Sequence, residues 1–181
     1  MSDDLDRGDS NRGDSQRSEA SLQEAELNKQ LVRDMLAALV KNRVGLMHDH
    51  WWADMVWIGP PGIGTMRGLH QFEYDLRASF LHSFPDKQLG ESILLAEGEW
   101  VAAQGYFHAT FARDWLGIPA TGRSTRIRYT DFWRVEVRGG IRKLAENRVT
   151  IDILHVLEQS GYDMGQVLRY LGARPPESFS E

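Results

Sequence analysis

The chain has 181 residues, which is enough for one domain with a full hydrophobic core and short for two. Hydrophobic residues make up 41% of it and charged residues 26%, as is usual for a globular protein. The formal net charge of -5 gives no reason to expect a nucleic acid or an anionic membrane as a partner. The lack of cysteine excludes disulfides, thiolate metal sites and cysteine nucleophiles. With no membrane-length apolar run and no secretory signal, we expect a cytoplasmic protein.

The N-terminal segment is polar, lacks aromatic side chains and repeats the tetrapeptide RGDS. A segment that cannot bury apolar surface does not offset the entropy lost on ordering. We therefore expect residues 1–21 to be a disordered tail, residues 22–174 to form one domain and residues 175–181 to be a second tail. RGDS could also serve in adhesion to a cell-surface receptor, but without an export signal we favour a solvated tail.

The first half of the domain has helical periodicity. Apolar residues recur every four positions from Leu27 to Leu39, which predicts an amphipathic helix. The stretch GLMHDHWW indicates a short helix or turn, and DMVWIGPPGIG a short strand ended by a proline-glycine loop. The stretch RGLHQFEYDLRASFLHSF is again helical and ends before Pro85.

After Pro85 the period becomes that of strands. The runs KQLGESILLAEG, EWVAAQGYFHATF, RSTRIRYTDFWRVEV and IRKLAENRVTID are separated by Gly98, the loop WLGIPATG and the turn RGG. Such short connections favour antiparallel pairing, because parallel neighbours need a longer crossover. A final helical stretch ends at Gly172.

Helices followed by an antiparallel sheet indicate the α+β class. Only two or three helices are available to cover one face of the sheet. A strongly curved sheet wrapped around the long helix would solve this and leave a pocket at its mouth.

Strand alternation makes Asp131 a candidate site residue. It shares one strand face with Ile127, Tyr129, Trp133 and Val135, so this face is expected to be concave and buried. Burial raises the pKa of a carboxyl group, and such groups often serve as general acids or bases. The alternative is a structural Asp that accepts hydrogen bonds from a neighbouring loop or an Arg.

Asp152 stands at the end of the last strand-like run. On a regular strand it shares a face with Glu146 and Arg148, while the more apolar face carries Val149 and Ile151. Hydrophobicity then leaves Asp152 outside, unless a bulge or the strand end turns it inward. It is either a chemical group of the pocket or the N-cap of the following helix, a role that Asp favours.

The six histidines show no metal-ligand spacing, and phosphate-loop, nucleophile-elbow and cofactor motifs are missing, so we expect neither a metal nor a cofactor. His108 is the most interesting of them, because it lies within a strand on the same face as Tyr106 and Gln104. A lone strand histidine is nevertheless more often a structural residue. Several tryptophans could line an aromatic cavity or fill the core: Trp51, Trp52, Trp57, Trp100 and Trp133.

The segments DMVWIGPPGIGTMRGLHQF, FLHSFPD, WLGIPATGR, DFWRVE and AENRVTID followed by LEQSG occur in this order between about Leu27 and Gly161. Together they resemble the SnoaL-like polyketide cyclases, often labelled ester cyclases, of the NTF2-like superfamily. The resemblance implies a cone-shaped α+β barrel in which a curved antiparallel sheet wraps around a long N-terminal helix. It also implies chemistry without a cofactor.

In the characterised cyclases a carboxylate acts as general acid/base for intramolecular aldol closure of a polyketide ester. The pattern E-N-x-V-x-I-D places Asp152 at the matching position, and Asp131 would be the second acidic group. In an apolar cup the two pKa values would separate, so one group could be charged while the other is protonated. His108 is the third catalytic candidate. The candidate substrate-binding residues are Trp57, Phe80, Tyr106, Tyr129, Trp133 and Arg148.

Arg148 departs from the family pattern, which usually has Trp after the motif EN. If it points inward, it could clamp an acidic substrate or lower the pKa of a neighbouring Asp. If it points outward, the aromatic wall is lost at this position. Either case bears on which substrate the pocket accepts.

The sequence thus predicts a cyclase or isomerase that uses carboxylate acid/base catalysis on a small hydrophobic carbonyl substrate. The alternative is a non-catalytic ligand-binding module, because this superfold hosts both. An epoxide hydrolase would need Arg-x-Asp on one strand face, and here Tyr129 stands two residues before Asp131. We also expect a homodimer that covers apolar strand faces at Phe107 and Phe111.

Overall fold

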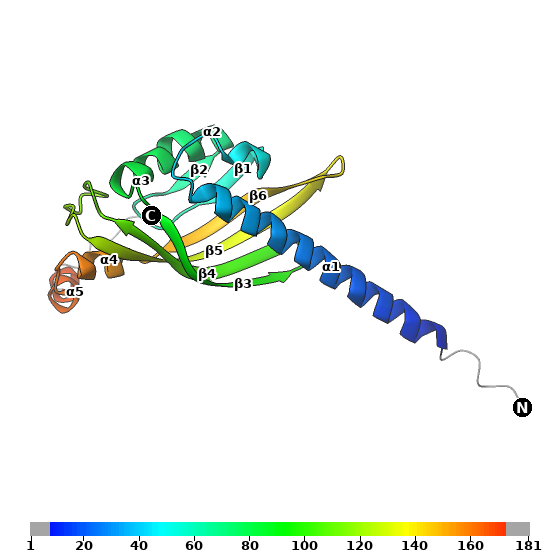
Figure 1. Cartoon of the computed structure of the whole chain (residues 1–181). Helices are drawn as coiled ribbons and strands as arrows, with labels where there is room; N and C mark the ends of the chain where they lie inside the picture. Colours follow the sequence, from blue (N-terminus) through cyan, green and yellow to red (C-terminus); the bar gives the residue numbers. More distant parts are fainter. Residues whose placement is uncertain (1–7, 173–181) are drawn as a thin grey trace, which may run out of the picture.

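A strongly curved sheet of six strands carries helices on its concave side (Figure 1). The computed structural model describes the backbone of residues 8–172 and, within it, the side chains of residues 19–170 and 172. Residues 1–7 and 175–181 of the two expected tails lie outside the described residues. The strands are β1 (Trp51–Ile58), β2 (Thr65–Arg67), β3 (Gln88–Glu97), β4 (Trp100–Thr110), β5 (Ser124–Arg138) and β6 (Ile141–Ile151).

Across the sheet the strands follow the order β2-β1-β6-β5-β4-β3. β3 to β6 form an antiparallel meander, as their short connections predict. β1 differs, because it pairs with β6 in parallel and with β2 antiparallel. The sheet curves without closing into a barrel. The predicted α+β architecture, a curved sheet with a long N-terminal helix, is confirmed.

Helix α1 (Gly8–Leu39) packs against β3 and β4 and projects beyond the sheet (Figure 1). Its buried Met35 and Leu36 belong to the apolar stripe that the sequence predicts. The helix already begins at Gly8, within segment 1–21 that we expected to be a tail. The division into tail and domain stays a prediction.

A second helical stretch covers the concave face on the side of β1 (Figure 1). It consists of α2 (Leu69–Gln71), the π-helical turn η2 (Phe72–Arg77) and α3 (Ala78–Ser83). It ends as predicted before Pro85, because a residue that precedes proline is disfavoured in the helical conformation. Phe84 accordingly has φ -130 and ψ 72.

Two short helices, α4 (Ile153–Gln159) and α5 (Met164–Gly172), follow β6 where the sequence indicates one helical stretch. Gly161, at φ 93, lies in the break between them, in a conformation that favours glycine. α4 packs on β5 and buries Val156. Among the described residues, no helix has the length and apolar character needed to cross a membrane.

Aromatic side chains fill much of the space between sheet and helices. Phe107 and Phe111 belong to this interior, with exposed fractions of 8% and 0%. Phe107 stacks on Tyr129 of β5, and Phe111 stacks on Phe84. The expectation that these two residues form an exposed face was therefore wrong, because the chain's own strands and helices cover them.

Candidate functional site

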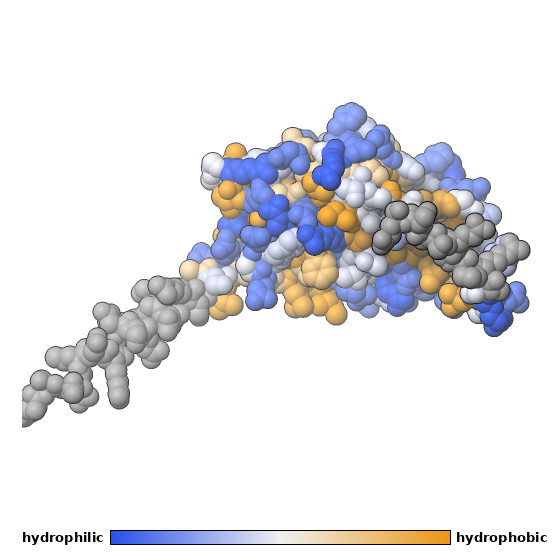
Figure 2. Space-filling view, turned by 180° about the vertical axis from the view of Figure 1, so that it is seen from behind, coloured by the Kyte–Doolittle hydropathy of each residue, from blue (hydrophilic) through white to orange (hydrophobic). Residues whose placement is uncertain are grey.

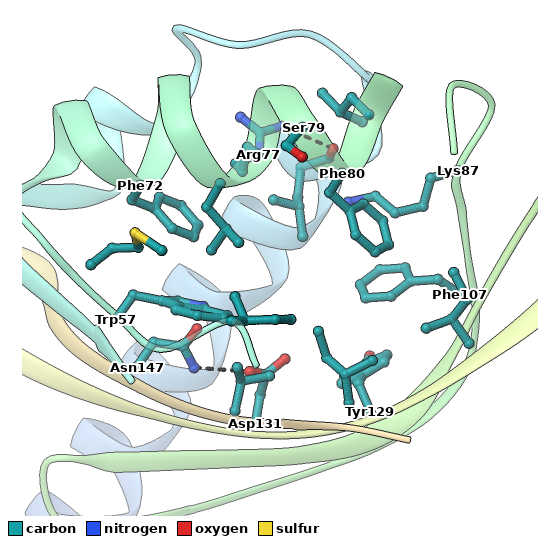
Figure 3. Close-up of a pocket in the computed structure, with 18 of the residues that line it drawn as sticks. Trp57, Phe72, Arg77, Ser79, Phe80, Lys87, Phe107, Tyr129, Asp131 and Asn147 are labelled. Carbon is teal, nitrogen blue, oxygen red and sulfur yellow. Dashed lines mark hydrogen bonds between the residues drawn. The ribbon is translucent and has the colours of Figure 1, made fainter. Parts of the chain in front are cut away.

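A cavity of about 280 Å³ lies between the concave face of the sheet and the helical layer (Figure 3). Its lining is mostly apolar and aromatic, and a few polar side chains converge on it, as is typical of a small-molecule site. Four predicted substrate-binding residues lie in this wall: Trp57, Phe80, Tyr129 and Trp133.

Asp131 reaches into the cavity from β5, on the strand face that alternation predicts. Its exposed fraction is 6%, and Asn147 Nδ2 donates a hydrogen bond of 2.9 Å to its Oδ1. Burial raises the pKa of Asp131 to about 7, although the Asn147 hydrogen bond and the positive charge of Lys87 act in the opposite direction. A carboxyl group with this pKa can both accept and return a proton near neutral pH.

Asn147 is positioned by the register of two neighbouring strands. On β6 it pairs with Trp133, while Asp131 pairs with the next inward residue, Val149. The more apolar face of β6 is thus the buried one, as hydrophobicity predicts, and the Asn amide reaches the carboxylate from it. Strand alternation could have identified Asn147 as a site residue, because it is the polar residue on that face.

Lys87 is a site residue that the sequence did not reveal. Its exposed fraction is 4%, and its side chain enters the cavity from just before β3, beside Phe80 and Phe107 (Figure 3). Nζ lies 4.7 Å from the ring centroid of Phe107 and 5.3 Å from that of Phe80. Burial lowers the pKa of Lys87 to about 7 together with the positive charge of Arg77, while Asp131 opposes the shift.

Arg77 lines the cavity as part of a buried ion pair. Its Nη1 lies 2.7 Å from Oε2 of Glu73, one helical turn earlier. The Glu73 carboxylate also accepts hydrogen bonds of 2.9 Å from the backbone N–H groups of Gly45 and Met47. The turn η1 (Met47–Asp49) is thereby tied to the helical layer. With its charge balanced, this pair has a structural role in shaping the cavity.

Tyr129 supplies a hydroxyl group that stays protonated. Burial and the negative charge of Asp131 raise the pKa of Tyr129 to about 12. Its ring stacks on Phe107 with centroids 4.6 Å apart. The ring fits there because its partner on β4 is Gly105, at which a Cβ atom would lie 2.9 Å from the hydroxyl oxygen.

Asp152 lies outside this cavity, which corrects the expectation that it shares a pocket with Asp131. Its Oδ1 accepts a hydrogen bond of 3.0 Å from the N–H of His155, so it caps α4. Its Oδ2 accepts from Nε of Arg128 at 2.9 Å. Partial burial acts to raise the pKa of Asp152, but Arg128 and the His155 N–H outweigh it and lower that pKa. The capping alternative describes this residue.

The other three candidates also lie outside the cavity, because alternation directs them to the outer face of the sheet. His108 is exposed next to the inward Phe107. Tyr106 packs its ring against the Arg126 guanidinium, 4.1 Å from the centroid. Arg148 pairs with Glu146 at 2.7 Å and lies above the ring of Trp100, so it points outward.

Within the described part of the chain, no group of three or more His, Asp or Glu side chains is placed to hold a metal ion. The ionisable side chains in the lining of the cavity are the buried Asp131, Lys87, Arg77 and Tyr129 and the exposed Asp75. Such groups can exchange protons with a bound organic molecule.

The sequence matches the family described as SnoaL-like polyketide cyclase over residues 29–160. A search of curated proteins found no match. AclR from Streptomyces galilaeus, a candidate hydroxylase, superposes with a TM-score of 0.63 at 23% identity, covering 76% of this chain and 97% of that one. IdmH from Streptomyces antibioticus, a candidate polyketide cyclase, superposes with a TM-score of 0.63 at 19% sequence identity, and the match covers 75% of this chain and 99% of IdmH. A candidate SnoaL-like polyketide cyclase from Jannaschia sp. CCS1 superposes with a TM-score of 0.61 at 17% sequence identity, and the match covers 72% of this chain and 88% of that one.

At these identities the structural likenesses bear on the fold alone. They agree with the resemblance read from the sequence, and an NTF2-like protein from Burkholderia xenovorans is among the similar structures. The family match covers most of the described residues. The chain therefore belongs to the SnoaL-like polyketide cyclase family and has its NTF2-like fold.

Proposed function

We propose that this protein is a cofactor-independent cyclase or isomerase that acts on a small hydrophobic carbonyl compound, with Asp131 as its general acid/base. The family match supports the reaction class. The aromatic wall of the cavity supports a hydrophobic substrate.

The observation that carries the proposal is the placement of Asp131. A carboxyl group in an apolar cavity, held through one oxygen by Asn147, is oriented and ready to remove a proton next to a carbonyl group. The ring of Tyr129, which stacks on Phe107, adds to the apolar wall beside this carboxyl group, while its buried hydroxyl lies over Gly105. Apolar surroundings strengthen the electrostatic interaction between the carboxylate and a bound substrate.

This mechanism uses one carboxyl group where the resemblance implied two. Asp152 caps a helix and pairs with Arg128 outside the cavity. A ligand-binding module without catalysis is the weaker alternative, because a purely apolar binding site gains nothing from a desolvated carboxyl group. The experiment must therefore separate proton transfer from binding.

The test is exchange of the α-protons of 1-tetralone, a small hydrophobic ketone, for deuterium in D2O, followed by NMR. We expect the wild type to accelerate this exchange and Asp131→Asn to lose the acceleration by roughly a hundredfold or more, while 1-tetralone still binds. Asp152→Asn is the matched control, because it makes the same change to an Asp outside the cavity. An Asp131→Asn variant with unchanged exchange would contradict the proposal.

We further propose that the protein is a homodimer formed through the outer face of the sheet. Ile93, Leu95 and Phe132 are exposed on β3 and β5, and the register places Leu95 beside Ala102, itself beside Phe132. Figure 2 shows hydrophobic residues gathered along the lower margin of the molecule, where β3 lies. The cytoplasmic location stays a prediction from the sequence.

A further inference from the structure

Lys87 is a buried amine for which the proton transfer described above has no use. Among the described residues, no hydrogen bond or ion pair engages its Nζ, and its close partners are the rings of Phe80 and Phe107. A buried ammonium group without a direct ion pair or hydrogen bond is costly, so a protein without a use for it would be expected to replace it with an apolar residue. Its presence in the cavity wall therefore points to a ligand or a reaction.

The backbone around Lys87 is held in place from two sides. Asn42, which has a φ of 53 beyond the end of α1, donates from Nδ2 to the carbonyl oxygen of Lys87 at 2.8 Å. The preceding Asp86 accepts hydrogen bonds of 2.7 and 2.6 Å from the backbone N–H and the hydroxyl of Thr110. The backbone from which the Lys87 side chain enters the cavity is thus held in place, which contributes to the preorganisation that a reacting group needs.

We propose that Lys87 is the nucleophile of this site and forms an imine with the carbonyl carbon of the substrate, across the cavity from Asp131. The inference deepens the proposed function, on which it rests, because it assigns an aldehyde or ketone as substrate class. Lysine becomes nucleophilic when it is desolvated in an apolar pocket or placed near another cation. Both conditions hold here, since burial and the nearby Arg77 lower the pKa of Lys87 to about 7.

The reaction needs no further reagent than water. The neutral amine adds to the carbonyl carbon, a C–N bond forms, the π electrons move to oxygen, and a proton passes from nitrogen to that oxygen. The protonated Asp131 then gives its proton to the hydroxyl group, water leaves, and the nitrogen lone pair forms the C=N bond of an iminium. The Asp131 carboxylate next removes an α-proton and yields an enamine. Asp131 then returns a proton to the α-carbon or to a conjugated carbon of the enamine, which gives the product iminium. Water adds to this iminium, the C–N bond breaks and the carbonyl product leaves, so that the neutral Lys87 amine is restored and the released proton returns to the Asp131 carboxylate.

The test is reductive trapping of the wild-type protein with benzaldehyde and sodium cyanoborohydride at pH 7, which converts the imine into a stable benzyl amine. The chain has four lysines, so Lys29, Lys41 and Lys143 serve as internal controls in the tryptic mass map. We expect Lys87 to be labelled at least about tenfold faster than the exposed Lys41, because an ordinary lysine with a pKa of about 10.4 is almost fully protonated at pH 7. The rate at Lys87 should follow a titration with its midpoint near 7.

Two variants separate this inference from the proposed function. Asp131→Asn should lose α-proton exchange yet still label Lys87, more slowly than the wild type but faster than Lys41, because addition of the amine does not require the carboxyl group and only the departure of water is slowed. Lys87→Met should lose both the label at this position and most of the exchange activity. Labelling of Lys87 no faster than that of Lys41 overturns the inference and leaves the role of Asp131 standing. Full exchange activity in a folded Lys87→Met protein overturns the inference as well. If that variant does not fold, the labelling rates of Lys87 and Lys41 in the wild-type protein decide the question.

Discussion

Asp131 and Lys87 enter one cavity from opposite sides, and each is shifted toward its neutral form (Figure 3). Burial is the largest cause for both, so the same apolar wall that binds a hydrophobic substrate also tunes the two groups. Their mutual attraction reduces both shifts without cancelling them. Both groups therefore have pKa values near neutral pH, so each can gain and lose a proton readily, as repeated proton transfer requires.

This arrangement predicts how Lys87 affects stability. Its pKa in the folded chain, about 7, lies below the ordinary value of 10.5, so between these two pH values the unfolded chain binds more protons than the folded one. The free energy of unfolding must therefore increase as the pH rises from 7 to 10.5, and it must decrease as the pH falls from 10.5 to 7. We expect Lys87→Met to lack this rise and to be more stable than the wild type at pH 7, by on the order of 3 kcal/mol.

The measurement is the free energy of unfolding in urea for both proteins at pH 7 and pH 10. The difference between the two proteins removes contributions from groups that they share. A difference that does not change with pH would contradict the burial of an amine without a partner.

Elements, rather than single residues, decide the role of the second acidic candidate. Asp152 lies where β6 ends and α4 begins, so its side chain serves the junction of the two elements. An Asp at this position satisfies an N–H group that a helix start leaves without an intrahelical partner. The ion pair with Arg128 also connects the junction to β5.

Two substitutions of Asp152 separate capping from catalysis. Asp152→Ala should lower the free energy of unfolding by about 1 kcal/mol, because alanine cannot cap. Asp152→Asn should have a smaller effect, because asparagine caps as well and the lost ion pair is half-exposed. Denaturant unfolding measures both. Neither variant should slow α-proton exchange, and a strong loss in Asp152→Asn would restore the mechanism with two carboxyl groups.

At the scale of the whole molecule, the sheet has two unlike faces. The concave face is covered by the chain's own helices and forms the cavity, whereas the outer face combines ion pairs with exposed apolar residues. Two such outer faces could pack on one another, as sheets do in sandwich proteins. The proposed dimer then leaves both cavities unobstructed.

The dimer is tested by light scattering at micromolar concentration. Leu95→Glu places a charge in the apolar row of Leu95, Ala102 and Phe132 and should produce monomers. Val137→Glu is the matched control, because it adds the same charge to a similarly exposed residue near the hairpin end of β5. A monomeric wild type would rule out the dimer.

Sequence alone determined what depends on local periodicity. Alternation placed Asp131 on the buried face of β5, the apolar face of β6 pointed inward, and the preference of Asp for helix starts described Asp152 better than the family pattern did. These predictions succeeded because the geometry of a strand or a helix start involves only neighbouring residues. The resemblance added the fold but also brought Asp152 forward as a catalytic residue of the pocket, and it left the orientation of Arg148 open.

Only the tertiary structure decided which groups share the cavity. Lys87 could not be found from the sequence, because a register shift between Leu89 and Ser92 interrupts the alternation of β3. Its position near Asp131 depends on packing between segments that are far apart in the chain. The burial of Phe107 was not predicted for the same reason. Strand alternation assigns a residue to one face of the sheet, but it cannot show which other element packs against that face.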